Sequence, residues 1–338
     1  TFNVIVEDNT NPVITVCATD QTVFVDDNCE IALADYTSLV SATDNCDLDI
    51  ELTQVPAPGA IFSGHNTNIP VSIFATDDNG NQVQCDFNVN ILDNTLPTIT
   101  CPANLTQSAD LGVCQANITI PAPVVADNCG IDTVINDYNG TADASDVYPV
   151  GTTTVTWTVT DNAGNTTTCD FDITITDDEA PVVTCIGDQT VSADAACNFT
   201  MTDYTALIAA TDNCDNNLDI VQVPAPGTVV SGTTAVDINI TDDAGNTTTC
   251  TFNVIVEDNT NPVITVCADD QTVFVDDNCE IALADYTSLV SATDNCDLDI
   301  ELTQVPAAGT IFAGHNTNIS VSIFATDDNG NQVQCDFN

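Results

Sequence analysis

The chain has 338 residues and no lysine or arginine, so its 51 aspartates and glutamates give a formal charge of −51. Nucleic acids and anionic lipid surfaces need a positive footprint on a partner, so the composition disfavours binding to either, and we expect no nucleic-acid partner. Hydrophobic residues make up 43% of the chain, too many for a disordered polyanion. No run of about 18 apolar residues occurs, so we expect no membrane insertion in this segment.

The chain is repetitive, because residues 1–88 return as residues 251–338 with 83 of 88 positions identical. Shorter repeats open with a proline and a short β run at Pro12, Pro97, Pro181 and Pro262. We therefore predict the end of a preceding repeat and a linker at 1–10. Four domains follow at 11–95, 96–179, 180–260 and 261–338, the last with an incomplete final strand. Such a chain is expected to be a window from a longer repetitive protein.

Each repeat has the pattern of a β-hairpin near its end. In the second repeat, alternation predicts strands at Thr152–Asp161 and Thr166–Thr176, with Val155, Trp157 and Val159 on one face. Trp157 is therefore expected in the core rather than in a sugar-binding platform. Short strands with turns about every ten residues, and no helical period, predict an all-β fold of tandem immunoglobulin-like β-sandwich domains.

Sixteen cysteines recur four to a repeat. Disulfides persist in oxidising compartments, so the count predicts an extracellular or cell-surface location. A zinc site would show short CxxC pairs with histidine nearby, and neither occurs.

The repeats resemble the hyalin-repeat (HYR) family. The resemblance lies in openings such as Ala180–Cys185 (APVVTC), in the closing run Thr154–Cys169, and in the motif ATDNC at Ala42–Cys46, Ala210–Cys214 and Ala292–Cys296. It covers all four repeats and implies an extracellular immunoglobulin-like fold associated with adhesion and matrix. The four-cysteine form resembles repeats of large surface adhesins of gliding Bacteroidetes-type bacteria. The hyalin layer of echinoderm embryos is a more distant comparison.

Four cysteines in a repeat allow three pairings. The first strand of a sandwich begins at the same pole as the last strand, and two-cysteine family members, on this resemblance, keep the first and fourth. We therefore expect the outer pairs Cys17–Cys85, Cys101–Cys169, Cys185–Cys250 and Cys267–Cys335. The inner pairs would then be Cys29–Cys46, Cys114–Cys129, Cys197–Cys214 and Cys279–Cys296.

Three aspartates recur in every repeat. The linker aspartates are Asp8, Asp93, Asp177 and Asp258; the DNC-loop aspartates are Asp44, Asp127, Asp212 and Asp294; the hairpin-turn aspartates are Asp77, Asp161, Asp242 and Asp327. In an immunoglobulin-like array these three positions meet where one domain receives the previous one, with Asn9, Asn45 and Asn79 as neighbours. Calcium favours such oxygen ligands, so we expect a structural calcium ion at each junction. The alternatives are a simple turn preference for aspartate, sodium, or diffuse counterions.

The sequence predicts a structural repeat segment of an extracellular filament, stalk or surface adhesin, rigidified by disulfides and calcium, and not an enzyme. His65 and His315 are interpreted as loop residues. The alternative is a ligand-binding adhesion module for a glycan or surface, which would need a distinctive exposed aromatic or apolar patch on one repeat. Partners would be other copies of the repeat, along the chain or in a bundle. N-x-S/T sequences, such as those that begin at Asn104 and Asn117, and Asp132–Val134, which resembles a bacterial acceptor motif, leave glycosylation open.

Residues 1–8 have the pattern of a final strand without the rest of its repeat, and the last repeat stops at Asn338 before its final strand is complete. Donor-strand exchange between copies would explain both features. Joining copies end to end would duplicate residues 1–3, which occupy the same repeat positions as residues 336–338. A window through a continuous chain is the simpler interpretation.

Overall fold

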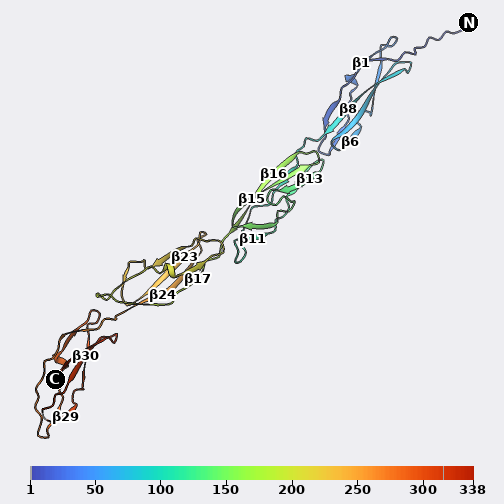
Figure 1. The fold of residues 1–338 in the computed structure, drawn as a ribbon. Helices are drawn as coiled ribbons and strands as arrows, with labels where there is room; N and C mark the ends of the chain where they lie inside the picture. Colours follow the sequence, from blue (N-terminus) through green and yellow to red (C-terminus); the bar gives the residue numbers. More distant parts are fainter. Residues whose placement is uncertain (1, 315) are drawn as a thin grey trace. The chain divides into compact units, whose positions relative to one another are not determined.

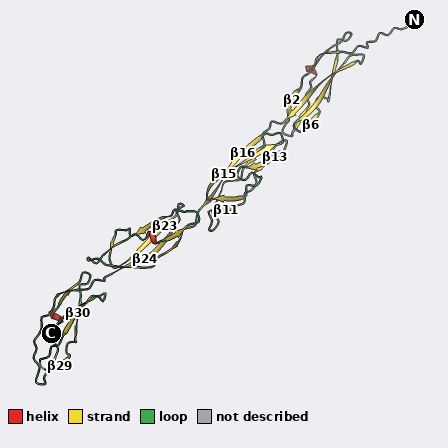
Figure 2. Cartoon of the chain, in the orientation of Figure 1, coloured by secondary structure: helices red, strands yellow, loops and turns green. Residues whose placement is uncertain are grey.

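The structure, a computed structural model, describes residues 2–314 and 316–338; His315 lies outside them. Apart from three short 3-10 turns, all regular elements in these residues are β-strands (Figures 1 and 2). The chain forms two compact units, Thr1–Asp177 and Asp178–Asn338, and each contains two sandwiches. The predicted all-β fold of tandem sandwiches is confirmed.

The first sandwich has a four-stranded sheet ordered β2-β8-β7-β5, with the two-stranded sheets β1-β4 and β3-β6 beside it. Strand β2 runs parallel to β8, and the other pairs are antiparallel. The elements are β1 Val13–Val16, β2 Gln21–Phe24, β3 Glu30–Ala32, η1 Thr37–Leu39, β4 Ser41–Thr43, β5 Glu51–Val55, β6 Ile61–Ser63, β7 Thr67–Thr76 and β8 Gln82–Leu92.

The second sandwich repeats this plan with the sheet β10-β16-β15-β13 and the pairs β9-β12 and β11-β14. Its strands are β9 Thr98–Thr100, β10 Leu105–Ser108, β11 Gln115–Ile118, β12 Val124–Ala126, β13 Ile131–Asn136, β14 Asp146–Pro149, β15 Gly151–Asp161 and β16 Thr166–Thr176. No 3-10 turn is assigned in this stretch of the described chain.

The third and fourth sandwiches form the second unit, with the larger sheets β18-β24-β23-β21 and β28-β30-β31. The third contains β17 Val182–Thr184, β18 Gln189–Ser192, β19 Phe199–Thr200, η2 Thr205–Leu207, β20 Ala209–Thr211, β21 Asp219–Val223, β22 Val229–Val230, β23 Thr233–Thr241 and β24 Thr247–Glu257. The fourth contains β25 Val263–Val266, β26 Glu280–Ala282, η3 Thr287–Leu289, β27 Ser291–Thr293, β28 Glu301–Val305, β29 Ile311–Ala313, β30 Val321–Thr326 and β31 Gln332–Phe337.

The hairpin of β15 and β16 carries the core of the second sandwich. Trp157 lies opposite Cys169 in the register, and Val155, Trp157 and Val159 are fully buried. Successive residues of a strand face opposite sides of a sheet, so the threonines between these positions face outward. The predicted hairpin and the core position of Trp157 are confirmed.

Each sandwich has two distinct poles, which the long last strand separates. At one end of β8, Leu92 lies opposite Phe24 of β2, just before the turn that contains Cys29. At the other end, β8 follows the hairpin turn that begins at Asp77. We call these the exit pole and the entry pole. An eleven-residue strand with a rise of roughly 3.3 Å per residue holds them about 33 Å apart.

Candidate cation sites and interdomain disulfides

The linker aspartate of the second sandwich follows β8 directly. Asp93 is 8% exposed, and its Oδ1 accepts a hydrogen bond from the backbone N–H of Thr95 at 2.9 Å. This local bond turns the linker, as aspartate side chains commonly do. The other oxygen, Asp93 Oδ2, is buried and has no hydrogen-bond partner in the described residues.

The DNC-loop aspartate likewise has one carboxylate oxygen with a hydrogen bond and one without. Oδ1 of Asp127 accepts the backbone N–H of Cys129 at 2.8 Å, which holds the loop after β12. Oδ2 of Asp127 is buried, and within the described chain it too accepts nothing. Burial of a charged oxygen without a hydrogen-bond donor costs free energy. In the described residues nothing offsets that cost for Oδ2 of Asp127.

The hairpin-turn aspartate is satisfied by an asparagine four residues later. Oδ1 of Asp161 accepts the backbone N–H of Asn165 at 2.8 Å, and Oδ2 accepts from Asn165 Nδ2 at 2.8 Å. The same Nδ2 lies 3.3 Å from the carbonyl oxygen of Asp93. Asn165 therefore ties the linker to the hairpin turn. Sequence reasoning missed this residue, although asparagine closes the turn in every repeat.

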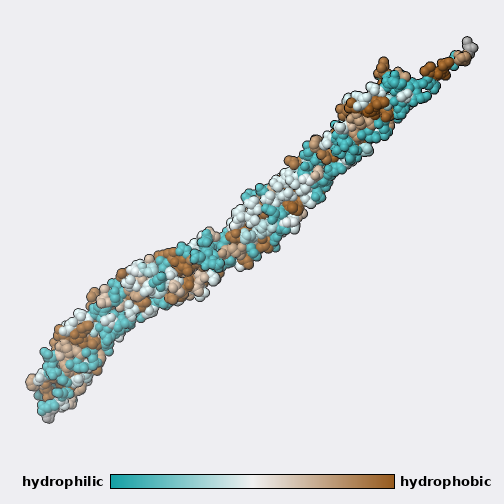
Figure 3. Space-filling view, turned by 45° about the horizontal axis from the view of Figure 1, so that its top comes forward, coloured by the Kyte–Doolittle hydropathy of each residue, from teal (hydrophilic) through white to brown (hydrophobic). Residues whose placement is uncertain are grey.

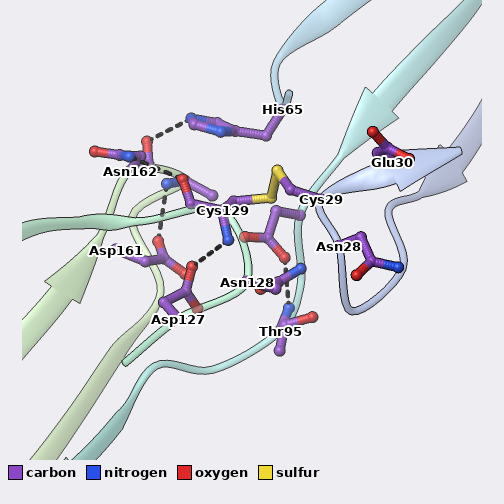
Figure 4. Close-up of a disulfide and its surroundings, with 12 residues drawn as sticks. Asn28, Cys29, Glu30, His65, Thr95, Asp127, Asn128, Cys129, Asp161 and Asn162 are labelled. Carbon is purple, nitrogen blue, oxygen red and sulfur yellow. Dashed lines mark hydrogen bonds between the residues drawn. A yellow bond between two sulfur atoms is a disulfide. The ribbon is translucent and has the colours of Figure 1, made fainter. Parts of the chain in front are cut away.

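These three carboxylates meet at the entry pole of the second sandwich. Asp93, Asp127 and Asp161 each place an oxygen within 4.8 Å of the others. Figure 4 shows Asp127 and Asp161 close together beside the Cys29–Cys129 disulfide. No lysine or arginine exists in the chain to neutralise them. Calcium, which takes six to eight oxygen ligands, fits this donor set better than a soft metal would.

The same arrangement recurs at the first sandwich. Asp8, Asp44 and Asp77 place oxygens within 4.8 Å of one another, and Oδ2 of both Asp8 and Asp44 is buried without a partner among the described atoms. Asn81 donates to the carboxylate of Asp77 at 2.7 Å and to the carbonyl of Asp8 at 3.0 Å. Of the expected asparagine neighbours, Asn45 donates to Cys46 Sγ at 3.1 Å and the N–H of Asn79 to Asp77 at 3.0 Å, while Asn9 is exposed.

Local hydrogen bonds and neighbouring charges shift two pKa values at this first site. The backbone N–H of Thr10 donates to Asp8 and lowers the pKa of its carboxyl group. The negative charge of Asp8, followed by desolvation and the charges of Asp44 and Asp77, raises the pKa of the Cys46 thiol. The shift of Cys46 reflects the dense cluster of negative charge, whereas the shift of Asp8 reflects its hydrogen bonds.

The second unit holds the remaining aspartates. Asp258 and Asp294 lie within 4.8 Å of each other and of Cys296 Sγ, and Oδ2 of both aspartates is buried without a partner in the described part of the chain. Cys296 is disulfide-bonded, so it offers no thiolate. The third aspartate, Asp327, is 6% exposed, and Asn331 joins its carboxylate to the Asp258 carbonyl.

In the third sandwich, Asp212 and Asp242 also place oxygens within 4.8 Å of each other. Asp242 is 6% exposed, and Oδ2 of Asp212 is buried with no partner in the described residues. Asp177, the expected linker aspartate, is the last residue of the first unit and is 8% exposed.

The outer disulfides close each sandwich from its first strand to its last. The structure contains Cys17–Cys85, Cys101–Cys169, Cys185–Cys250 and Cys267–Cys335, the pairs expected from the sequence. In each pair the Cα atoms lie between 5.6 and 6.0 Å apart, within the range that a disulfide bridges.

The inner pairing expected from the sequence is wrong. Cys29 bonds to Cys129 rather than Cys46, and Cys197 bonds to Cys296 rather than Cys214. The pairs Cys114–Cys129 and Cys279–Cys296 are thereby excluded as well. Cys114 and Cys214 are disulfide-bonded, whereas Cys46 and Cys279 are free and exposed. The reason is geometric: the second cysteine lies at the exit pole and the third at the entry pole, so they meet only across a junction.

Polar contacts accompany the disulfide between the first two sandwiches (Figure 4). His65 Nε2 lies 2.8 Å from the carbonyl oxygen of Asn162. Asn128 Nδ2 donates to the carbonyl of Asp26 at 2.9 Å. In the second unit, the equivalent Asn295 Nδ2 lies 3.4 Å from the carbonyl of Asp194. His65 is thus a loop residue that contacts the next domain.

The fold and these junctions define a class of protein: tandem β-sandwich repeats joined by disulfides that cross from one repeat to the next. The HYR domain family model matches residues 92–175 and 176–256. Among the described residues, no helix has the length and apolar character needed to cross a bilayer.

Two curated relatives are hyalins. Hyalin of Strongylocentrotus purpuratus is 29% identical over 345 residues, which cover 98% of this chain and 28% of the relative. Hyalin of Lytechinus variegatus is 28% identical over 336 residues, which cover 95% of this chain and 61% of the relative. The chain therefore spans less than two thirds of either. Both relatives are metazoan and lend no support to a bacterial adhesin.

Solved structures share the β-sandwich array only distantly. The alignment with the EC3-6 structure of protocadherin gammaB7 covers 96% of this chain and 99% of the protocadherin chain. The two chains are 13% identical in sequence, and the TM-score is 0.33. A score this low adds nothing to the assignment of function.

Proposed function

We propose that the chain is a structural segment of an extracellular adhesive or matrix array, in which all four sandwiches act as HYR repeats. Calcium bound at the entry poles would hold each linker against the sandwich that follows it. The disulfides support an oxidising, extracellular setting. The likeness to the hyalins over nearly the whole chain supports the repeat assignment.

The observation that carries the calcium proposal is a set of buried oxygens without donors. In the described residues, Oδ2 of the linker aspartate and Oδ2 of the DNC-loop aspartate lack hydrogen-bond partners at three junctions. The pairs are Asp8 and Asp44, Asp93 and Asp127, and Asp258 and Asp294. A turn preference for aspartate explains the satisfied Oδ1 atoms but not these Oδ2 atoms. A cation would satisfy both oxygens and offset the repulsion between the carboxylates.

The proposed ion has a mechanical consequence. Its ligands come from three segments: the linker, the DNC loop and the hairpin turn. Binding would therefore restrict the linker relative to the sandwich that follows, in parallel with the cross-junction disulfide. An array with such junctions would resist bending and unravelling better than one with free linkers.

Calcium titration of the oxidised 338-residue chain tests the proposal. Isothermal titration calorimetry is expected to show saturable binding whose stoichiometry falls by one site in Asp127→Asn. This variant keeps an oxygen for the N–H of Cys129 but removes one charged ligand, which weakens the site by at least about tenfold. Asp170→Asn, at an exposed position of β16, is the matched control. Absence of binding, or equal stoichiometry in the two variants, would overturn the calcium assignment.

A further inference from the structure

The junction between the first two sandwiches carries a histidine beside its disulfide. His65 is one of two histidines in the chain, and it lies in the loop between β6 and β7. A ring nitrogen of His65 and the sulfur atoms of Cys29 and Cys129 all lie within 4.8 Å of one another. Figure 4 shows the ring of His65 beside the Cys29–Cys129 disulfide. Two sulfurs and an imidazole at this spacing are a donor set for a thiophilic cation once the S–S bond is open.

Backbone hydrogen bonds place the His65 loop next to Cys29. The N–H of Gly64 donates to the carbonyl oxygen of Cys29 at 3.0 Å, and Ser63 of β6 lies opposite Glu30 of β3. Gly64 has a φ of 94°, a conformation that glycine adopts without strain. The loop that carries His65 is therefore held against the turn that carries Cys29.

Asn162 of the second sandwich connects His65 to Cys129. The carbonyl oxygen of Asn162 lies 2.8 Å from His65 Nε2, and Asn162 Nδ2 donates to the carbonyl of Cys129 at 3.0 Å. Because a carbonyl only accepts, Nε2 carries the hydrogen and Nδ1 keeps the lone pair of the neutral ring. Metal-binding histidines commonly donate one ring N–H to a carbonyl while the other nitrogen binds the metal. The support for a ligating His65 is thus already present.

A dissolved ion has access to these side chains. Cys29, His65 and Cys129 are half-buried rather than enclosed. Figure 3 shows hydrophilic residues interspersed with small hydrophobic patches over the surface of the first unit. The formal charge of −51 attracts cations at long range. Access and charge both favour binding of a divalent cation at this junction.

The equivalent junction of the second unit lacks the histidine. Cys197 and Cys296 form the same kind of disulfide between successive sandwiches. Residues 231–234 (SGTT) stand where the first sandwich has residues 63–68 (SGHNTN). The three-ligand set therefore belongs to the first of these two junctions.

We propose that the reduced junction between the first two sandwiches binds a thiophilic divalent cation, best matched by zinc, through Cys29 Sγ, Cys129 Sγ and His65 Nδ1. Zinc takes four ligands in a tetrahedron, with sulfur at about 2.3 Å and nitrogen at about 2.0 Å, and a water molecule would complete the set. The protein ligands come from both sandwiches, so zinc would hold the reduced junction closed where the disulfide holds the oxidised one. This site is independent of calcium, which prefers oxygen ligands.

The two states interconvert by a balanced exchange. A dithiol such as dithiothreitol gives two electrons and two protons to the Cys29–Cys129 bond, which opens to two thiols while the dithiol closes to a cyclic disulfide. Zinc then displaces both thiol protons, which pass to the buffer, because the thiolate is the ligand. Oxidised glutathione reverses the change: it accepts two electrons from the thiolates, its own S–S bond breaks into two thiolates, and zinc leaves.

Cobalt spectroscopy of the 338-residue chain tests the site. The free thiols of Cys46 and Cys279 are first alkylated, and a dithiol is then added stepwise under native conditions. Peptide mapping identifies the fraction in which Cys29 and Cys129 are reduced. Cobalt(II) should give this fraction a sulfur-to-metal charge-transfer band that the oxidised chain lacks, and zinc should abolish the band. A reduced fraction without the band would overturn the proposal.

His65→Gln tests the third ligand. Glutamine keeps an N–H donor for the Asn162 carbonyl but has no ring nitrogen to bind the metal. Zinc affinity should fall by at least about 10- to 100-fold, because loss of an outer partner of a metal ligand already costs that much. His315→Gln, at the other histidine, is the control and should leave the affinity unchanged. Equal affinity in the two variants would contradict a role for His65 as a ligand.

A variant that needs no reductant tests the same geometry. Cys29→His cannot form the disulfide, and histidine tolerates the positive φ of 58° at this position better than most residues do. Without reductant, calorimetry should show zinc bound by two imidazoles and the Cys129 thiolate. Addition of His65→Gln should weaken this binding by the same factor as in the reduced chain. Absence of zinc binding in Cys29→His would show that the three positions do not converge on one ion.

Discussion

Cys29 and Cys129 are 100 residues apart in the chain, yet their Cα atoms lie 4.9 Å apart in a disulfide between successive sandwiches. Cys197 and Cys296 repeat the relationship in the second unit. The crosslink is offset by one repeat, so it fastens the junction, while the outer disulfides fasten each sandwich internally.

Removal of the junction disulfide should loosen the linker while leaving the sandwiches folded. A bond that closes a loop of this length contributes about 4 kcal/mol on the chain-entropy account. In Cys29→Ser with Cys129→Ser, we expect hydrogen exchange of the linker around Thr95 to accelerate by about tenfold, with unchanged circular dichroism. The equivalent linker around Thr260, where Cys197–Cys296 is intact, is the internal control. Equal exchange before and after substitution would contradict a fastening role.

The carboxylate cluster predicts that the effect of Asp127→Asn on thermal stability depends on calcium. Asp127→Asn removes one of three mutually repelling charges, so in EDTA it should leave thermal stability unchanged or raise it. In calcium at about 100 times the dissociation constant, it should lose about 2–3 kcal/mol of ligand stabilisation. Fluorescence of Trp157, the single tryptophan, reports unfolding of this sandwich. Equal destabilisation with and without calcium would indicate a purely structural role for Asp127.

The asparagine that closes the hairpin turn should stabilise the junction independently of any ion. Asn165→Ala removes the donor to Asp161 and to the Asp93 carbonyl and leaves both acceptors partly buried. A loss of about 1–3 kcal/mol is expected in urea unfolding. Thr166→Ala, at the next and exposed position, should change the free energy of unfolding by less than about 0.5 kcal/mol.

Tyr148 predicts an alkaline transition in the second sandwich. Burial raises the pKa of Tyr148 to about 12, and its hydroxyl donates to the Ala144 carbonyl at 2.5 Å. An unfolded tyrosine titrates near 10, so the stabilisation is fully present below about pH 10 and is lost as pH rises through about 12.

Absorbance at 295 nm during alkaline titration measures this directly. The latest-titrating tyrosine signal should disappear in Tyr148→Phe. If all tyrosine signals rise together near pH 10 in the native chain, the hydroxyl of Tyr148 is not protected in the way described.

The features that could be predicted from the sequence are those that depend on residues of a single repeat. Alternation in Thr152–Asp161 placed Trp157 in the core, because a strand with period two has one inner face. Pairing of the first and fourth cysteines followed from the ends of one sandwich. The partner of Cys29 could not be predicted from one repeat. Each repeat has four cysteines, so all of them can be paired within the repeat without a partner from the next one.

The bridging asparagines escaped prediction for a related reason. Asn81 and Asn165 stand in ordinary turn sequences, where asparagine is common without any special role. Their second donor bond reaches a linker carbonyl more than 70 residues away in the chain. Only the folded junction shows that contact.

Peptide mapping of the oxidised, unreduced chain by mass spectrometry tests the central claim most directly. The account predicts a peptide that links Cys29 to Cys129 and another that links Cys197 to Cys296, with Cys46 and Cys279 as free thiols in freshly purified monomer. Peptides linking Cys29 to Cys46 and Cys279 to Cys296 would contradict it, since every sandwich would then be closed on itself and no disulfide would join one repeat to the next.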